Sequence, residues 1–219
     1  MVVRFEVAHP LLSTPAADNL VVGRFSQAGL DDAQLVRDVV RGDHQALDVV
    51  WDRYSGLVRS VLFGALGCDS SIEDLRQDVF MAFFRGAAQV REGAALKGYL
   101  VGIAVRLAAL ELRRRKVRRW VGLSVSGELP ELPVAPQDSE GREALTALYR
   151  VLDGLSSRRR LAFVLRHVQG MEILEVALAL EISESTARRE LSKAQQQLTA
   201  LARREPALAS WWRVLAHHE

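Results

Sequence analysis

Hydrophobic residues recur at three- and four-residue steps along most of the chain after Asp31. The first long run extends from Leu35 to Leu62, and Gly42-Asp43 interrupts it where one helix would end and the N-cap of the next would lie. This pattern predicts two amphipathic helices that meet at Gly42. Residues 1–30 contain prolines and glycines without sustained periodicity, so we expect a flexible N-terminal arm there.

Two more helices are predicted before residue 120. Ser71 is a candidate N-cap for a helix over 72–85, with Asp74 at capping-box spacing. This helix would bury an apolar and aromatic stripe, and its opposite face would carry Asp74, Gln77, Asp78 and Met81. The other helix, over 96–119, places Tyr99, Arg106 and Arg113 on one stripe that leads into a basic block.

The basic block, RRRKVRR at 113–119, is cationic at six of its seven positions. Its members are Arg113, Arg114, Arg115, Lys116, Arg118 and Arg119. Such a run repels itself unless solvent or a polyanion surrounds it. Two interpretations follow: a solvated helix end that the helix dipole favours, or a patch that contacts phosphates.

An acidic, proline-bearing segment divides the chain into two helical units. Residues 121–140 contain four acids, no bases and three prolines, which indicates a flexible linker with a net charge of −4. We predict an all-α protein with one domain over 31–120, a second over 141–202 and a C-terminal helical extension over 203–219. The extension is Trp-rich, and we expect it to pack on one of the domains; the alternative is a docking surface for a regulator.

The second unit contains the spacing of a helix-turn-helix. Ile173, Val176, Ala177 and Leu180 suit one short helix, a turn of about three residues follows, and Ser183 can cap a second helix. Hydroxyl and cationic side chains on the second helix suit phosphates and base edges in the major groove. The candidate residues are Ser183, Ser185, Thr186, Arg188, Arg189, Ser192 and Lys193. An ordinary helical hairpin of a bundle is the alternative.

Composition narrows the class of protein further. The 219 residues include 49% hydrophobic residues, so the chain can bury cores, and its one cysteine excludes intrachain disulfides and a thiolate zinc site. No apolar stretch reaches the ~18 residues of a membrane span, and no secretory signal is evident, so we expect a cytoplasmic protein without membrane insertion. We find no metal-ligand spacing, cofactor motif or activated nucleophile, which argues against an enzyme such as a recombinase.

Two motif blocks together resemble a known family. Residues 152–198, LDGLSSRRRLAFVLRHVQGMEILEVALALEISESTARRELSKAQQQL, resemble region four of bacterial sigma factors of the extracytoplasmic-function (ECF) group. Upstream, RGDHQALDVVWDRY and IEDLRQDVFMAFFRG, within 41–86, resemble region two of the same group. One helix-turn-helix would be a weak signal, but the ordered pair around a linker is specific.

The resemblance implies a sigma factor that binds core RNA polymerase and promoter DNA. The face of Asp74, Gln77, Asp78 and Met81 would contact the polymerase clamp helices. The helix over 96–119, with Tyr99, Arg106 and the basic block, would hold DNA near the minus-ten element and capture an unstacked base. The helix from Ser183 to Lys193 would read the minus-thirty-five element.

Departures from the family pattern leave alternatives open. Arg106 and Leu110 stand where family members usually have an amide and an acid. At Arg106 the guanidinium replaces the selective hydrogen bonding of an amide with charge. In the helix-turn-helix, Glu181 stands where the family usually has a turn glycine. If that position has positive φ, glutamate there costs about 1 kcal/mol. A sigma-like DNA-binding regulator that no longer opens promoters is therefore the rival interpretation. The sequence also leaves open whether an anti-sigma factor or another regulatory protein binds the chain.

Overall fold

The computed structural model of the chain describes residues 29–67, 70–90, 96–120 and 139–208, and these ranges are helical with no strand. The expectations for the N-terminal arm, for the acidic linker and for the tryptophans of the C-terminal extension lie outside the described residues. The all-α prediction is confirmed.

Four helices form the first domain. They are α1 (Gly29–Val40), α2 (His44–Leu66), α3 (Ile72–Gly86) and α4 (Leu96–Trp120), with the short turn η2 (Ala87–Gln89) after α3. Gly42 has a φ of 83°, and the side chain of Asp43 accepts a hydrogen bond from the backbone N–H of Gln45. The helix break predicted at Gly42 is therefore confirmed, and glycine adopts this φ without steric conflict.

The core of this domain lies where α2, α3 and α4 pack together. Val58, Phe83 and Leu100 are among its fully buried side chains. One buried acid, Asp32, ties α1 to α2, since it accepts hydrogen bonds from the Tyr54 hydroxyl at 2.7 Å and from Arg53 Nη1 at 3.1 Å. This pairing satisfies the charge that burial would otherwise leave isolated.

The second domain contains the predicted helix-turn-helix. Its elements are α5 (Ser139–Asp153), α6 (Ser157–Phe163), the π-helical turn η3 (Val164–Val168), α7 (Ile173–Ala179), α8 (Glu184–Ala202) and the turn η4 (Pro206–Leu208). Leu208 is buried in a cluster that α5 and α8 complete. The part of the C-terminal extension that the structure describes, residues 203–208, therefore packs on the second domain.

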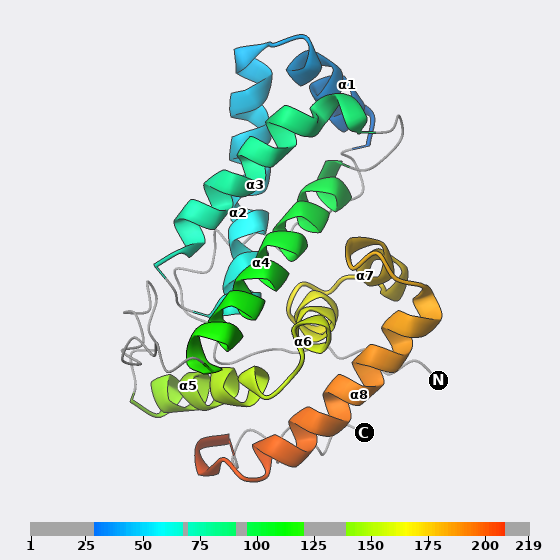
Figure 1. The fold of residues 1–219 in the computed structure, drawn as a ribbon. Helices are drawn as coiled ribbons and strands as arrows, with labels where there is room; N and C mark the ends of the chain where they lie inside the picture. Colours follow the sequence, from blue (N-terminus) through cyan, green and yellow to red (C-terminus); the bar gives the residue numbers. More distant parts are fainter. Residues whose placement is uncertain (1–28, 68–69, 91–95, 121–138, 209–219) are drawn as a thin grey trace.

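The two domains pack against each other along α4. Figure 1 shows α4 between α2 and α3 on one side and α6 and α7 on the other. Buried residues of α6 and α7, such as Leu161 and Val176, belong to the same apolar cluster as the core of the first domain. This contact joins segments on opposite sides of the 121–138 segment.

One predicted local feature is wrong. Ser71 precedes α3 as expected, but it has helical φ and ψ values and its side chain makes no capping hydrogen bond. A capping serine needs extended φ and ψ angles to direct its oxygen toward the N–H groups of the first turn. The helix itself begins at Ile72 as predicted and extends to Gly86.

Candidate nucleic-acid interface

The helix-turn-helix is built by a capped turn between α7 and α8. Ser183 has extended backbone angles, and its side chain accepts a hydrogen bond from the N–H of Thr186. Glu181 is the one non-glycine residue with positive φ, at 55°, in the described part of the chain. The small, buried Ala177 lets α7 approach α8 closely. The predicted cap and the suspected positive φ are both present.

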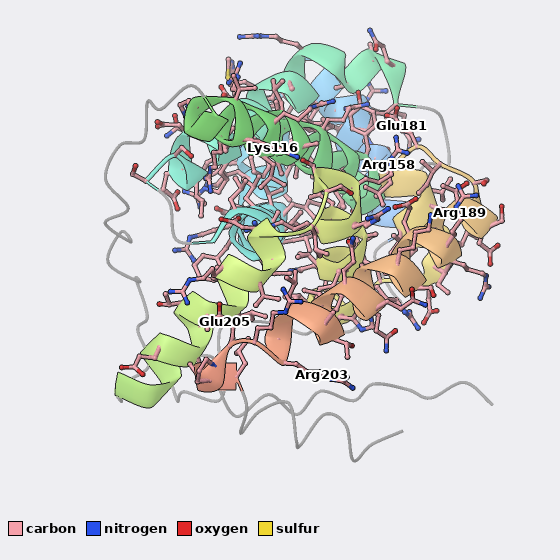
Figure 2. All side chains as sticks on the ribbon, turned by 60° about the horizontal axis from the view of Figure 1, so that its bottom comes forward. Lys116, Arg158, Glu181, Arg189, Arg203 and Glu205 are labelled. Carbon is pink, nitrogen blue, oxygen red and sulfur yellow. The ribbon has the colours of Figure 1, made fainter. Side chains whose placement is uncertain are left out.

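The polar face of α8 points to solvent. Of the seven candidate residues, Thr186 is half-buried and the other six are exposed. The exposed residues are Ser183, Ser185, Arg188, Arg189, Ser192 and Lys193. Arg188 forms an ion pair with Glu184 one turn earlier, with 3.2 Å between Arg188 Nε and Glu184 Oε1. Figure 2 shows Arg189 at the outer edge of the second domain. An exposed polar surface is thus available on this helix.

An arginine on α6 forms an ion pair and a hydrogen bond with α8. Arg159 donates to Glu190 Oε2 at 3.1 Å and to Gln197 Oε1 at 3.0 Å, while Ser156 caps α6 through the N–H of Arg159. Sequence reasoning did not single out Arg159. The signal that could have found it is the lone acid, Glu190, on the otherwise apolar inner side of α8, which needs a cation.

The stripe predicted on α4 contains side chains in three different situations. Tyr99 is half-buried, with its ring edge-on to Phe83 at a centroid distance of 6.2 Å. Arg106 is exposed but forms an ion pair with Glu181 of the second domain, with 2.8 Å between Nη1 and Oε1. Arg113 is exposed to solvent. The structure thus brings Arg106 to the helix-turn-helix and keeps Tyr99 at the edge of the core.

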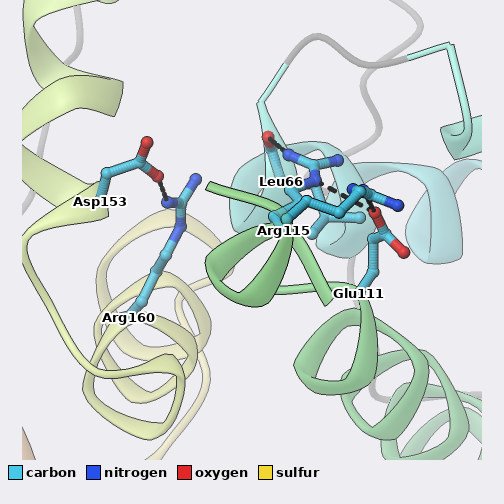
Figure 3. A network of polar contacts seen from close by, with 6 residues as sticks. Leu66, Glu111, Arg115, Asp153 and Arg160 are labelled. Carbon is cyan, nitrogen blue, oxygen red and sulfur yellow. Dashed lines mark hydrogen bonds and ion pairs between the residues drawn. The ribbon is translucent and has the colours of Figure 1, made fainter. Parts of the chain in front are cut away.

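The basic block is divided between solvent and the domain core. Arg113, Arg114, Lys116 and Arg118 are exposed, whereas Arg115 is half-buried. Arg115 Nη1 donates to the carbonyl of Leu66 at 2.8 Å, and so satisfies a carbonyl at the end of α2 (Figure 3). The side chain of Arg119 lies outside the described ones.

A buried acid that the sequence analysis passed over organises this block. Glu111 is 8% exposed and accepts from Arg118 Nη2 at 2.6 Å and from Arg115 Nε at 3.4 Å. Its spacing of four and seven residues from these arginines places all three on one side of the helix. A single acid just before a run of bases is the signal that could have revealed it.

The predicted polymerase face of α3 is exposed. Asp74, Gln77, Asp78 and Met81 all reach solvent, and Met81 is 47% exposed. On the adjoining side of the helix, Glu73 pairs with Arg59 of α2 at 3.1 Å, and Arg76 lies 4.8 Å from the centre of the Trp51 ring. These contacts fix α3 on α2 and leave the acidic face free of the core.

Among the residues that the structure describes, burial shifts the pKa of three side chains. Desolvation is the main cause in each: it raises the pKa of Tyr54, whose hydroxyl also donates to Asp32, and lowers the pKa of Arg160 and of His167. Arg160 is 2% exposed and pairs with Asp153, which opposes the loss of its charge (Figure 3). For His167 the positive charge of Arg166 adds to the effect of burial.

The described ranges show neither a metal site nor a membrane span. They contain no group of three or more His, Cys, Asp or Glu side chains placed to hold a metal ion. None of their helices combines the length and apolar character that crossing a bilayer requires.

Both halves of the chain match known families. Residues 50–118 match the family described as Sigma-70 region 2, and residues 145–198 match Sigma-70, region 4. The chain is 28% identical over 170 residues to the ECF RNA polymerase sigma factor SigM of Mycobacterium tuberculosis, which covers 78% of this chain and 84% of that protein. It is 24% identical over 178 residues to the ECF RNA polymerase sigma-E factor of Escherichia coli K12, covering 77% and 93%.

Solved structures show the same fold. CnrH, in its complex with the cytosolic domain of CnrY, superposes with a TM-score of 0.57 at 20% identity, covering 78% of this chain and 96% of that chain. The sigma factor RpoE of Bartonella quintana, solved with the anti-sigma factor NepR, gives a TM-score of 0.54 at 20% identity, covering 71% and 96%.

The chain therefore belongs to the ECF group of the sigma-70 family. It is a sigma factor that binds core RNA polymerase and directs promoter recognition and transcription initiation. Sigma factors are regulatory, non-catalytic proteins. The resemblance seen in the two motif blocks is confirmed.

Proposed function

We propose that this chain divides the work of a sigma factor among three surfaces. The acidic face of α3 binds core polymerase, the stripe and basic block of α4 hold and open DNA at the minus-ten element, and the polar face of α8 reads the minus-thirty-five element. The observation that carries this proposal is the order of a region 2 match and a region 4 match in one chain, with the polar face of α8 exposed.

The chemistry of each surface supports its assignment. Carboxylates and an exposed methionine on α3 suit a basic and apolar protein surface, and Asp74 and Asp78 are not used to hold the domain together. The cations of α4 suit phosphates, because backbone contacts fix a protein on DNA. Hydroxyl and guanidinium groups on α8 suit base edges. No covalent step is assigned to this chain, and it acts where polymerase and chromosome are, in the cytoplasm.

Transcription with purified components tests this function. The full chain is mixed with core polymerase and a genomic library, and transcript starts are mapped. We expect specific starts that depend on the chain and that share two upstream elements. Background transcription with no added specificity, together with no co-elution with core polymerase, would contradict the proposal.

A second candidate function is a sigma-like regulator that binds polymerase and DNA without opening promoters. The observation that favours it is Arg106, whose guanidinium cannot accept hydrogen bonds from a base and here pairs with Glu181. Permanganate footprinting separates the two functions. A working factor exposes unpaired thymines near the start site, and a regulator leaves them paired.

A regulatory protein partner is also part of this proposal. Two structurally similar sigma factors were solved with CnrY and with the anti-sigma factor NepR. We expect a tagged full chain to co-purify with a protein that core polymerase displaces. Recovery of polymerase subunits alone, under conditions in which the factor is inactive, would count against such a partner.

A further inference from the structure

One arginine connects α6 with two side chains of α8, which lies beside α6 in the second domain (Figure 1). Arg159 Nε donates to Glu190 Oε2 at 3.1 Å, and Arg159 Nη1 donates to Gln197 Oε1 at 3.0 Å. The side chains of Arg159 and Glu190 are 25% and 13% exposed, so salt screens this ion pair less than it screens a fully exposed one. The guanidinium therefore joins the two helices at two points.

The two partners of Arg159 lie on the same edge of α8. Glu190 and Gln197 are seven positions apart in the sequence, which corresponds to about two helical turns, about 10 Å along the axis and about 20° around it. A single contact would leave the helix free to pivot about that point. Two contacts that are separated along one edge restrict both the rotation of α8 about its axis and its sliding along α6.

The apolar face of α8 supplies burial without a directional restraint. Hydrophobic contact is non-directional, whereas the hydrogen bonds of a planar guanidinium have preferred distances and angles. Most of the buried residues of α8 are small alanines, and the full set is Ala187, Leu191, Ala194, Leu198 and Ala202. Arg159 adds the directional restraint that these apolar contacts lack.

Arg159 is itself held at the beginning of α6. Ser156 is the N-cap of this helix, with extended backbone angles, and its hydroxyl accepts a hydrogen bond from the backbone N–H of Arg159 at 3.4 Å. Leu161 and Ala162 of the same helix are buried in the apolar core. The guanidinium thus reaches α8 from a backbone position that is fixed by a cap and by packing.

The edge that Arg159 holds borders the polar face of α8. Glu190 directly follows Arg189 and lies two positions before Ser192, and both of these neighbours are exposed. Side-chain tips lie about 5–6 Å from the axis of an α-helix, so a rotation of about 20° displaces them by about 2 Å. Such a displacement breaks a hydrogen bond, because donor and acceptor must lie within about 3.2 Å. The rotation of α8 therefore decides which base edges its polar side chains reach.

We propose that Arg159 is a positioning residue for promoter recognition: by holding Glu190 and Gln197 it fixes the rotation of α8 in the major groove and so contributes to sequence specificity at the minus-thirty-five element. This inference rests on the function proposed above for α8. Arg159 acts through the helix and contacts no base in this role. Loss of its contacts therefore lowers discrimination between DNA sequences more than it lowers affinity for DNA of any sequence.

A simpler role for Arg159 leads to different expectations. Glu190 is an acid on a helix that faces phosphates, and any cation beside it would cancel its charge. If neutralisation were the whole role, Arg159→Lys would behave like wild type, because lysine keeps the charge. A lysine ammonium lacks the planar fork of arginine, so the positioning role predicts that this variant fails to hold both partners at once.

Gln197→Met tests the positioning role without changing any charge, and Gln197 is exposed, so the fold tolerates the substitution. Holoenzyme assembled from core polymerase and the full chain is bound to a promoter duplex found in the transcription assay above, with the upstream element intact or scrambled. We expect the ratio of the two affinities to fall about tenfold in Arg159→Lys and about threefold in Gln197→Met, which keeps the ion pair. Affinity for the scrambled duplex and its salt dependence should stay at the wild-type values.

Each variant has a matched control in the same domain. Gln195→Met changes another exposed glutamine of α8, two positions before Gln197. Arg150→Lys disturbs another arginine–carboxylate pair, since Arg150 Nη1 lies 2.9 Å from Oε2 of Glu205, which follows the end of α8. Both controls should keep the wild-type ratio. Urea unfolding of every variant checks the fold, because a merely structural role would lower stability and leave the ratio of the two affinities unchanged.

The possible failures are distinguishable because wild type is measured on both duplexes. A wild-type ratio in both Arg159→Lys and Gln197→Met would overturn the positioning role alone. So would a pattern in which only Arg159→Met weakens binding, and weakens it equally for the two duplexes, because neutralisation predicts that pattern. A wild-type holoenzyme that binds the intact and the scrambled element equally would overturn the function proposed for α8, and with it the positioning role.

Discussion

At the residue scale, Glu181 has two opposing effects on stability. Its positive φ costs about 1 kcal/mol relative to glycine, while an exposed ion pair such as that with Arg106 contributes about 0–1 kcal/mol. We expect Glu181→Gly to be more stable than Glu181→Ala by about 1 kcal/mol in urea unfolding, because both variants lose the carboxylate but only glycine relieves the backbone. Equal stabilities of the two variants would show that the turn is not strained.

His167 is expected to make folding sensitive to acid. Burial and Arg166 lower its pKa in the folded chain, so the unfolded chain binds an extra proton as the pH falls below about 6.5. The contribution of the neutral imidazole is therefore present above this pH and lost as the pH falls through it. Between pH 7.5 and 5.5, His167→Phe should lose less unfolding free energy than wild type, since phenylalanine keeps the contact with Phe163. Equal losses in both proteins would contradict this assignment.

At the element scale, α4 divides its cations between DNA and the domain core. Six phosphate contacts would give a slope of about −5 for log affinity against log salt concentration, and Arg114→Ala should make that slope shallower by about 1 without changing stability. Arg115→Ala should instead destabilise the domain by about 2 kcal/mol, because the Leu66 carbonyl loses a charged donor. Each variant serves as the control for the other. Matching effects on DNA binding and stability would mean that the block acts as one surface.

The acidic face of α3 has a separate prediction. Asp74→Ala combined with Asp78→Ala should weaken association with core polymerase, while thermal unfolding stays within the range of an ordinary surface substitution. Glu73→Ala is the control on the same helix, since Glu73 pairs with Arg59 and Arg76 on the adjoining side. Co-elution with core polymerase at unchanged affinity in the double variant would remove α3 from the interface.

Elements and their exposed faces were predictable from the sequence, because periodicity reports which side of a helix is buried. The bounds of α3 and α4, the break at Gly42 and the Ser183 cap follow from residue types within a few positions of each other. Ser71 shows the limit of such local rules, since its backbone angles are helical. The inward direction of Arg115 was not predictable, because its partner, Leu66, is 49 positions away.

At the scale of the whole molecule, the contact between the domains could not be read from the sequence. Hydrophobic periodicity marks Leu161 and Val164 as buried but does not say against which helix. Gly64 of α2, where an added Cβ would lie 2.8 Å from Val164 Cγ1, looks in the sequence like an ordinary break in helix propensity. Its role is defined only by Val164, 100 positions later, which no local pattern connects with it.

A shared apolar cluster also makes a prediction about unfolding. Because buried residues of α2 and α4 are continuous with those of α6 and α7, loss of one domain exposes part of the other's core, so the two should unfold together. Calorimetry of wild type should give a single transition whose calorimetric enthalpy equals its van't Hoff enthalpy. A Cβ added at Gly64 of α2 would lie 2.8 Å from Val164 Cγ1 in the second domain, whereas one added at Gly56 meets nothing within 4 Å. In Gly64→Leu the ratio of calorimetric to van't Hoff enthalpy should therefore rise above one, while Gly56→Leu should keep the wild-type ratio. Two separate transitions already in wild type would mean that the domains contact each other too weakly for their folding to be coupled.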